Sequence, residues 1–353
     1  MYNFNICVNY KKMLQNIPIS KISKDKNLHT NFINSKINDF NLKCNIYKGD
    51  FYSDTFNFFL IDKNFKTFKN LFIRDFYQNT EHYFTNNFFN NLKENIEKLK
   101  EFKNIFILGS SAGNNYYSNL IQFIPRIFYI KENNIKIAIH RNSSVKFRNF
   151  IKYILKNKKI DFSFVYLDDG FYKFTDCQFP QFFNIANSNL ILKKFLKPKS
   201  FNSKDKKIYV TREDSSYRKI VNEADIIPIL RSKGYKIINP QLYTIDQQIQ
   251  IFSEADKIIG AHGSNLSNII FCKPETEIFE IGPEFKKEHE KIFENRYKIL
   301  AKINNLKYKR FITDTVPVGN HSELSRKYID KDILSNSNYY KNLIVKLNDI
   351  KAI

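Results

Sequence analysis

Two short stretches in the C-terminal half of the chain combine glycine, histidine and charged residues in a way that suits anion binding. The first, Thr211 to Asp214, follows the apolar run Ile208–Val210, and the second, Gly260 to Gly263, follows Ile258–Ile259. Small residues flank His262, so the predicted turn holds it away from the core, and the helix expected next offers unpaired N–H groups and a positive dipole end. We expect an anionic ligand to contact His262, Gly263, Ser264 and Asn265, with Ser264 or Asn265 as the N-cap.

Charged residues around these turns are further candidates. Arg212 follows a buried strand directly, where a guanidinium can reach a phosphate through two parallel hydrogen bonds, although a solvated loop arginine is the alternative. Arg218 and Asn222 are four residues apart on a predicted helix and share one face, which for mixed charge is often only solvated. Glu213 and Asp214 are the candidates for a catalytic base by position.

Glu280 lies inside the apolar strand I-F-E-I-G-P, where a bare carboxylate is costly to bury. Two alternatives stay open: it pairs with a structural arginine, or it binds ribose hydroxyls at the end of the strand. The pair Asp168 and Asp169 precedes Gly170 and fits a turn as well as a metal motif. Either residue is also a candidate for the catalytic base, because the pair lies at the end of a predicted strand in the first domain.

Several kinds of site are not indicated. There is no G-x-G-x-x-G or P-loop, no G-x-S-x-G elbow, and no spacing of histidine, cysteine or carboxylate typical of a metal site. The four cysteines contain no CxxC pair, and we expect neither a zinc site nor a disulfide framework. No metal or other cofactor is therefore expected.

Apolar runs alternate with helical patterns along most of the chain, which favours parallel sheets in an α/β fold. The charged stretch 193–207 divides the chain near residue 205. We predict strands at 135–139, 162–167, 208–210, 235–238, 258–259 and 278–281, and helices at 83–103, 145–155, 218–231 and 245–255.

The formal charge of +22 admits a polyanionic partner such as nucleic acid or an anionic membrane. However, 47 of the 57 basic residues are lysine and ten are arginine, alongside abundant Phe, Tyr, Ile and Asn, a pattern that compositional drift explains better. The N-terminal residues lack the order of a signal peptide and no run could span a bilayer, so we expect a cytoplasmic protein.

The motifs Y-V-T-R-E-D-S-S-Y-R-K-I-V-N-E, G-A-H-G-S-N-L-S-N-I-I-F and E-I-F-E-I-G-P, in this order, resemble the catalytic domain of glycosyltransferase family 61. The resemblance is strong from about residue 206 to 308. In the N-terminal half, N-Y-Y-S-N-L-I-Q-F-I-P-R is similar to another family segment and makes Asn115 a binding candidate. Ser118 and Asn119 depart from the histidine and tryptophan usual there.

The resemblance implies a GT-B fold, with two Rossmann-like domains facing across a cleft. Residues 1–205 would form the acceptor-side domain, residues 206–310 the nucleotide-sugar domain, and residues 311–353 a tail that packs back on the first domain.

The implied reaction is metal-independent, inverting transfer from a nucleotide-sugar, expected to be a UDP-sugar, to a glycan or lipid-linked acceptor in surface polysaccharide biosynthesis. The resemblance assigns donor binding to Arg212, Arg218, Asn222, His262, Gly263, Ser264, Asn265 and Glu280. A basic surface could associate with an anionic inner membrane. The alternatives are a catalytically inactive binding or assembly subunit, motivated by Ser118 and Asn119, and a basic nucleic-acid-binding protein.

Overall fold

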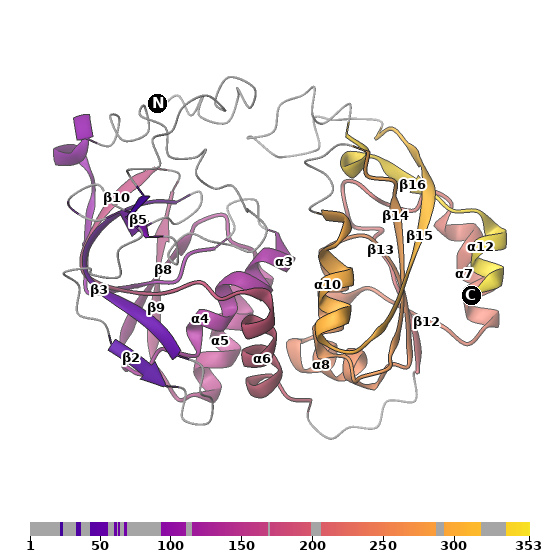
Figure 1. The fold of residues 1–353 in the computed structure, drawn as a ribbon, viewed down its shortest axis with the longest axis horizontal. Helices are drawn as coiled ribbons and strands as arrows, with labels where there is room; N and C mark the ends of the chain where they lie inside the picture. The colour runs from indigo at the N-terminus through magenta and orange to yellow at the C-terminus, as the bar shows by residue number, and fades with distance from the viewer. Residues whose placement is uncertain are drawn as a thin grey trace. The chain divides into compact units, whose positions relative to one another are not determined.

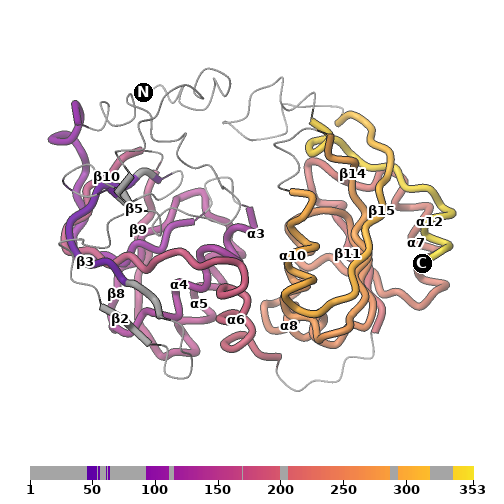
Figure 2. The backbone as a smooth tube through the Cα atoms, viewed as in Figure 1, coloured from indigo at the N-terminus to yellow at the C-terminus, as the bar shows by residue number. Residues whose placement is uncertain are grey.

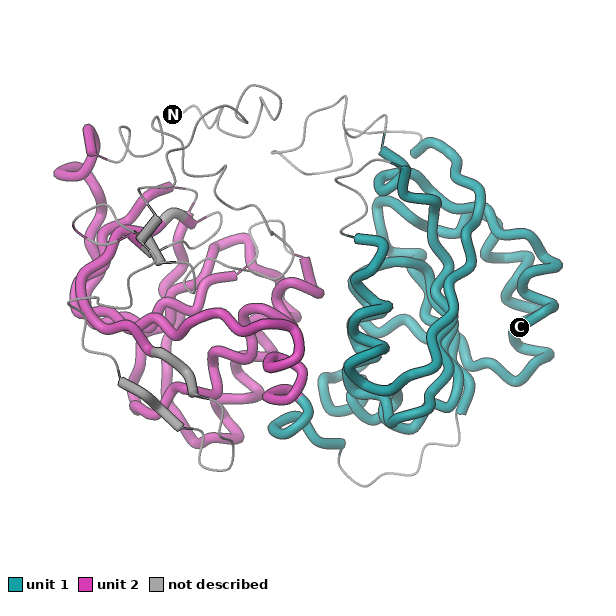
Figure 3. Tube along the Cα trace, viewed as in Figure 1, with its two compact units in different colours: residues 1–9, 193–353 teal, residues 10–192 magenta. Residues whose placement is uncertain are grey.

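The computed structural model describes residues 22–23, 33–36, 43–55, 60–61, 63, 67–68, 93–110, 115–168, 170–198, 206–286, 293–318 and 337–353. Two compact units make up the chain, unit 1 with residues 1–9 and 193–353 and unit 2 with residues 10–192 (Figure 3). The division thus falls at residue 192, whereas the sequence analysis placed a boundary near residue 205. Each unit has its own sheet, labelled in Figure 1 and traced along the backbone in Figure 2.

Unit 1 is built on a six-stranded sheet in the order β12-β11-β13-β14-β15-β16. The strands are β11 (Lys207–Val210), β12 (Lys236–Ile238), β13 (Lys257–Ala261), β14 (Glu277–Pro283), β15 (Lys307–Val316) and β16 (Asn342–Ile344). The first five run parallel and only β16 pairs antiparallel, with β15. β11 and β13 are almost wholly apolar because strands of a parallel sheet are covered on both faces.

Helices cover both faces of this sheet (Figure 1). On one face lie α7 (Glu223–Ser232) and α12 (Leu347–Ala352), whose apolar side chains form one cluster with Tyr209, Ile259 and Ile281 of the strands. On the other lie α8 (Ile245–Glu254), the 3-10 helix η7 (Ser264–Phe271) and α10 (Arg296–Ile303). The core of unit 1 therefore consists of two apolar layers, one on each side of the sheet.

The strand order creates a switch point between β11 and β13. The chain passes from β11 to its neighbour β12 on one side and then returns to form β13 on the other side. Val210 near the end of β11 pairs with Gly260 of β13, so the residues that follow the two strands meet at one edge. Open α/β sheets bind their ligands at such a point, and the two polar stretches of the sequence both lie there.

The C-terminal segment belongs to unit 1. The sequence analysis treated residues 311–353 as a tail packed on the first domain, but β15 continues to Val316 and β16 and α12 complete the sheet and helical layer of unit 1. Asn222 fastens this segment: its Nδ2 donates to the Val345 carbonyl at 2.8 Å and its Oδ1 accepts from the Val345 amide at 3.0 Å. The described part of this C-terminal segment is thus an integral part of unit 1.

Unit 2 contains a ten-stranded mixed sheet in the order β1-β5-β4-β3-β10-β7-β8-β9, with β2 beside β3 and β6 beside β10. Its strands are β1 (Ile22–Ser23), β2 (Ile33–Lys36), β3 (Lys43–Asp54), β4 (Leu60–Ile61), β5 (Thr67–Phe68), β6 (Glu101–Lys103), β7 (Ile105–Ile107), β8 (Ile135–His140), β9 (Phe162–Leu167) and β10 (Phe171–Pro180). β7, β8 and β9 are parallel, and the long β3 and β10 are antiparallel.

The helices of unit 2 follow the parallel strands. They are α3 (Tyr116–Ser118), the π-helical η5 (Asn119–Phe123), α4 (Ile124–Ile127), α5 (Val145–Asn157) and α6 (Ile185–Phe195). Pro125 has no N–H to donate to the preceding turn, which accounts for the π turn just before it. The Arg126 guanidinium is fully buried and donates to the carbonyls of Ile107, Leu108 and Pro180, so it pins the end of β7.

The predicted α/β fold with parallel sheets is confirmed, and two predicted helices differ. The helix expected at 218–231 begins at Glu223, because the Arg218 amide donates to the Lys341 carbonyl and Arg218 has a φ of 57°. Of the helix expected at 83–103, the described part begins at residue 93. Residues 93–94 are helical, the 3-10 helix η4 (Ile96–Lys98) follows, and the last three residues form β6 instead. No helix in the described ranges is long and apolar enough to cross a membrane.

Asn222→Ala removes both hydrogen bonds that fasten Val345 to unit 1. Because the Val345 amide and carbonyl then lose their partners, we expect the free energy of unfolding to fall by about 1–3 kcal/mol, measured by urea denaturation. Asn295→Ala is the matched control, since this exposed asparagine makes no side-chain capping bond. Equal stability of the two variants would show that Asn222 does not fasten the segment.

Candidate functional site

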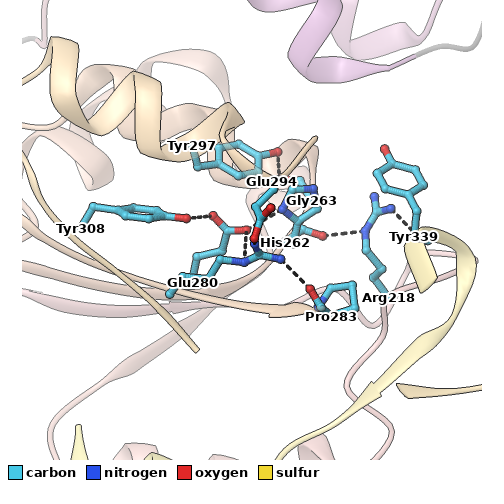
Figure 4. A network of polar contacts seen from close by, with 10 residues as sticks. Arg218, His262, Gly263, Glu280, Pro283, Glu294, Tyr297, Tyr308 and Tyr339 are labelled. Carbon is cyan, nitrogen blue, oxygen red and sulfur yellow. Dashed lines mark hydrogen bonds and ion pairs between the residues drawn. The ribbon is translucent and has the colours of Figure 1, made fainter. Parts of the chain in front are cut away.

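A buried imidazole–carboxylate pair lies at the centre of the polar network in unit 1 (Figure 4). His262 follows β13 and Glu280 lies on the neighbouring β14, and both residues are 0% exposed. His262 Nδ1 is 2.5 Å from Glu280 Oε1, and the Tyr308 hydroxyl donates to Glu280 Oε2 at 2.6 Å. Both carboxylate oxygens are therefore occupied by protein groups. Of the two roles considered for Glu280, pairing within the protein is the one observed.

Burial and nearby positive charge set the protonation of this pair. The pKa of His262 is lowered well below its ordinary 6.5, first by burial and then by the four guanidinium groups of Arg218, Arg296, Arg310 and Arg212. Burial raises the pKa of Glu280 from 4.5 to about 7, against the opposing effect chiefly of Arg310, whose Nε is 3.7 Å from the carboxylate. At neutral pH the imidazole is uncharged.

Arg212 packs directly on Gly263, the residue after His262. A Cβ atom built on Gly263 would overlap Nη1 and Cζ of Arg212 and lie 2.9 Å from its Nε, so only glycine leaves room for the guanidinium. The φ of Gly263 is 177°, an extended conformation, so close approach and not backbone freedom requires the glycine. The two residues that the sequence analysis expected to converge, Arg212 and His262, are thus neighbours at the switch point.

The Arg212 guanidinium is buried, and no carboxylate among the described residues pairs with it. Its Nη2 donates to the Tyr217 carbonyl at 3.1 Å, while its Nε is buried with no hydrogen-bond partner among the described residues. Burial, then the charge of Arg218, lowers the pKa of Arg212 to about 10, so the group stays protonated at neutral pH. A buried cation with a vacant donor is a ready partner for an anion.

Arg218 is hydrogen-bonded to the backbone of the turn that contains His262. Its Nε donates to the His262 carbonyl and its Nη1 to the Tyr339 carbonyl, each at 2.7 Å (Figure 4). The guanidinium also lies over the rings of Tyr217 and Tyr339, at 4.5 and 3.9 Å from their centroids. Arg218 was expected to bind the ligand, but these contacts make it a brace for the His262 turn.

Two further bonds complete the support of the turn. The Tyr297 hydroxyl donates to the Gly263 carbonyl at 2.6 Å, and the His262 amide donates to the Ile281 carbonyl at 2.6 Å. Arg310 donates to Glu294 Oε1 at 2.9 Å and to the Pro283 carbonyl at 2.6 Å. The carbonyls of His262 and Gly263 thus both accept side-chain hydrogen bonds, which keeps the first amides of η7 in one place.

Positive charge gathers around His262. Four guanidinium groups act on its pKa, and one of them, Arg310, lies near the buried Glu280 and pairs with the partly exposed Glu294. Buried positive charge is stabilised by a nearby negative group. The arrangement therefore suits an anionic ligand.

The helix after the turn differs from the prediction at its start. η7 is a 3-10 helix that begins at Ser264, its N-cap is Gly263, and no side chain caps it. Neither Ser264 nor Asn265 is the N-cap, because the extended Gly263 occupies that position beneath Arg212. Ser264 is partly exposed and Asn265 is buried, and their amides lie at the positive end of the helix dipole.

Three other predicted residues lie apart from this network. Glu213 and Asp214 are exposed on the loop after β11, where Asp214 Oδ2 accepts from Asn239 Nδ2 at 3.3 Å. Both polar atoms of the Asn222 side chain form hydrogen bonds with the backbone of Val345. The loop places the two carboxylates near the switch point, and Asn222 has a structural role.

Asn115 belongs to unit 2. It is the N-cap of α3, and its Oδ1 accepts from the Ser118 amide at 3.2 Å. Asp168, at the end of β9, pairs with Arg141 at 2.5 Å, and Asp169 lies outside the described residues. No group of three histidine, cysteine or carboxylate residues that could hold a metal occurs within the described ranges.

Sequence reasoning missed the residues that reach the network from β15, α10 and the C-terminal segment. Arg310 and Tyr308 lie on β15, in register with Glu280 and Ile278 of β14. The sequence did hold one signal for these partners. The strand after the one with the buried glutamate carries a tyrosine and an arginine two residues apart, so both side chains lie on the same face.

With this geometry in view, a comparison with protein-family models is decisive. The model described as Glycosyltransferase 61 matches residues 51–279, which is most of the chain. The chain belongs to glycosyltransferase family 61. A search of curated proteins found no match. As a family 61 glycosyltransferase, the protein is a transferase that uses a sugar donor and a glycan acceptor.

The coupled pKa values of Glu280 and His262 predict a pH effect. Between about pH 4.5 and 6.5 the pair binds one proton in the folded protein, on Glu280, and one proton in the unfolded chain, on His262. Because the two states bind equal numbers of protons, the pair does not make the free energy of unfolding depend on pH in this range. In Glu280→Gln only the lowered pKa of His262 remains. The unfolded state then binds the extra proton, and the variant loses up to about 1.4 kcal/mol per pH unit below pH 6.5, relative to wild type.

Urea denaturation of both proteins at pH 5, 6 and 7 measures this difference. Glu277→Gln, on the same strand but partly exposed, is the control and is expected to follow the wild type. Parallel pH profiles for wild type and Glu280→Gln would contradict the assigned protonation.

Proposed function

We propose that this glycosyltransferase binds the diphosphate of a nucleotide-sugar, with UDP as the expected nucleotide, at the switch point between β11 and β13. The observation that carries the proposal is the protonated, buried Arg212, packed on Gly263 with a vacant Nε donor. The amides at the start of η7 and the guanidinium groups that act on His262 support it, because both favour an anionic group.

The same groups suit catalysis without a metal. When the bond from the anomeric carbon to the diphosphate breaks, negative charge grows on the departing oxygen, and preorganised donors lower the barrier most. Arg212 and the η7 amides supply such donors, and their rigid support means that little reorganisation accompanies the reaction. Loss of one donor of this kind typically costs about 2.7–4 kcal/mol of barrier.

Transfer with inversion needs one direct attack by an acceptor hydroxyl and a base that takes its proton. Asp214 and Glu213 stay our predicted candidates, since both are exposed on the loop that carries Arg212. We further infer a GT-B arrangement, supported by two units that each contain parallel strands. A glycan or lipid-linked acceptor, a role in surface polysaccharide synthesis, and a cytoplasmic site next to an anionic membrane stay predictions.

Thermal shift with UDP tests the site. UDP at a hundredfold excess over its dissociation constant is expected to stabilise the wild type by about 2.7 kcal/mol. Arg212→Ala and Gly263→Ala remove or displace the guanidinium, and each should abolish the shift. The control is Arg231→Ala, which removes an exposed arginine of α7 and should keep the full shift. An unchanged shift in both site variants would refute the assignment.

A further inference from the structure

The two ring nitrogens of His262 have different surroundings. Nδ1 is 2.5 Å from a carboxylate oxygen of Glu280, whereas Nε2 is buried and has no hydrogen-bond partner among the described residues. Above the pKa of Glu280, which is about 7, the carboxylate is ionised and only accepts hydrogen bonds, so Nδ1 carries the ring proton. Nε2 is then left with a lone pair and can only accept.

The neighbours of the pair reinforce this tautomer. Tyr308 donates to the second oxygen of Glu280, and Arg310 lies 3.7 Å from the first, so the carboxylate is held in one orientation as an acceptor. Four guanidinium groups and complete burial oppose a second proton on the ring. The result is a neutral imidazole with a fixed direction for its lone pair.

A lone pair cannot bind an ionised phosphate, which has no proton to donate. It requires a hydroxyl or an N–H group. Arg212 packs on Gly263, the residue after His262. In a nucleotide-sugar the sugar is joined directly to the diphosphate, so a diphosphate bound by Arg212 would leave the sugar hydroxyls close to His262.

We propose that Glu280 is a positioning residue that holds His262 as the hydrogen-bond acceptor for a hydroxyl group of the transferred sugar, while Arg212 binds the diphosphate. This inference rests on the proposed function, since it needs a nucleotide-sugar at the switch point. It divides the work of the site: Arg212 recognises the nucleotide part, and His262 distinguishes a nucleotide that carries a sugar from one that does not.

Aromatic rings surround the imidazole. Phe285, Tyr297 and Tyr339 lie edge-to-face with it, at centroid distances of 5.2, 5.1 and 6.1 Å. Because Nε2 is buried, a sugar hydroxyl reaches it only when a neighbouring side chain moves aside. Sugar binding then gives a buried acceptor the partner it lacks, which is a favourable exchange.

Nitrogen-15 NMR of histidine-labelled protein at pH 8 tests the tautomer without any ligand. His262→Asn identifies the His262 signals among the six histidines of the chain. We expect a protonated Nδ1 and an unprotonated Nε2 in the wild type. In Glu280→Gln, the side-chain amide can accept from Nδ1 or donate to it, so both tautomers are expected.

Calorimetric titration with UDP, and then with UDP-glucose, UDP-xylose and UDP-N-acetylglucosamine, tests the role. His262→Asn keeps an amide donor toward Glu280 but removes the Nε2 acceptor. Its affinity for UDP should stay within about twofold of wild type, while its affinity for the best UDP-sugar should fall about tenfold, the effect of one hydrogen bond. Glu280→Gln should show a smaller selective loss of about twofold, because about half of its rings keep the active tautomer.

The outcomes separate the two ideas. A protonated Nε2 in the wild type, or an equal loss of UDP and UDP-sugar affinity in His262→Asn, overturns the inference and leaves the proposed function intact. Absence of nucleotide binding by wild type removes the proposed function and the sugar role together, while the NMR result still decides the tautomer.

Discussion

The site in unit 1 depends on positive charge buried around one neutral imidazole. Guanidinium groups lose their hydration when they are buried, and that loss must be offset by acceptors within the protein or by a bound anion. The backbone carbonyls of Tyr217, His262, Pro283 and Tyr339 accept from Arg212, Arg218 and Arg310, and the carboxyl group of Glu280 lies 3.7 Å from Arg310. The buried Nε of Arg212 has no hydrogen-bond partner among the described residues, and it is the donor that we propose binds an anionic substrate.

Close approach of backbone and side chain gives the site its shape. Arg212 reaches over the turn because residue 263 has no side chain, and a Cβ on Gly282 would lie 3.3 Å from the His262 Cβ and from Arg310. Glycine thus appears twice where charged groups and backbone must come within contact distance. The spacing H-G after one strand and I-G-P at the end of the next is therefore a packing requirement of the charged network.

The sequence was sufficient for the parallel sheets and for the meeting of Arg212 with His262. The strands are short apolar runs between turns, and side chains that follow adjacent parallel strands must lie at one edge. The side-chain partners of Glu280 and Asn222 could not be predicted from the sequence. Glu280 pairs within the protein because Tyr308 and Arg310 lie beside it. The Asn222 side chain is hydrogen-bonded to Val345, more than a hundred residues later in the chain, and not to the other site residues. Such contacts come from tertiary packing and leave no local periodicity.

Arg218 donates hydrogen bonds to the carbonyls of both His262 and Tyr339, so the site unites segments that lie far apart in the chain. During synthesis, the parallel strands β11, β13 and β14 can pair as soon as they leave the ribosome, but Arg218 has no final anchor until residue 339 has also emerged. The hydrogen bonds that hold the His262 turn are therefore completed only after residue 339 has been synthesised, when β11, β13 and β14 can already be paired.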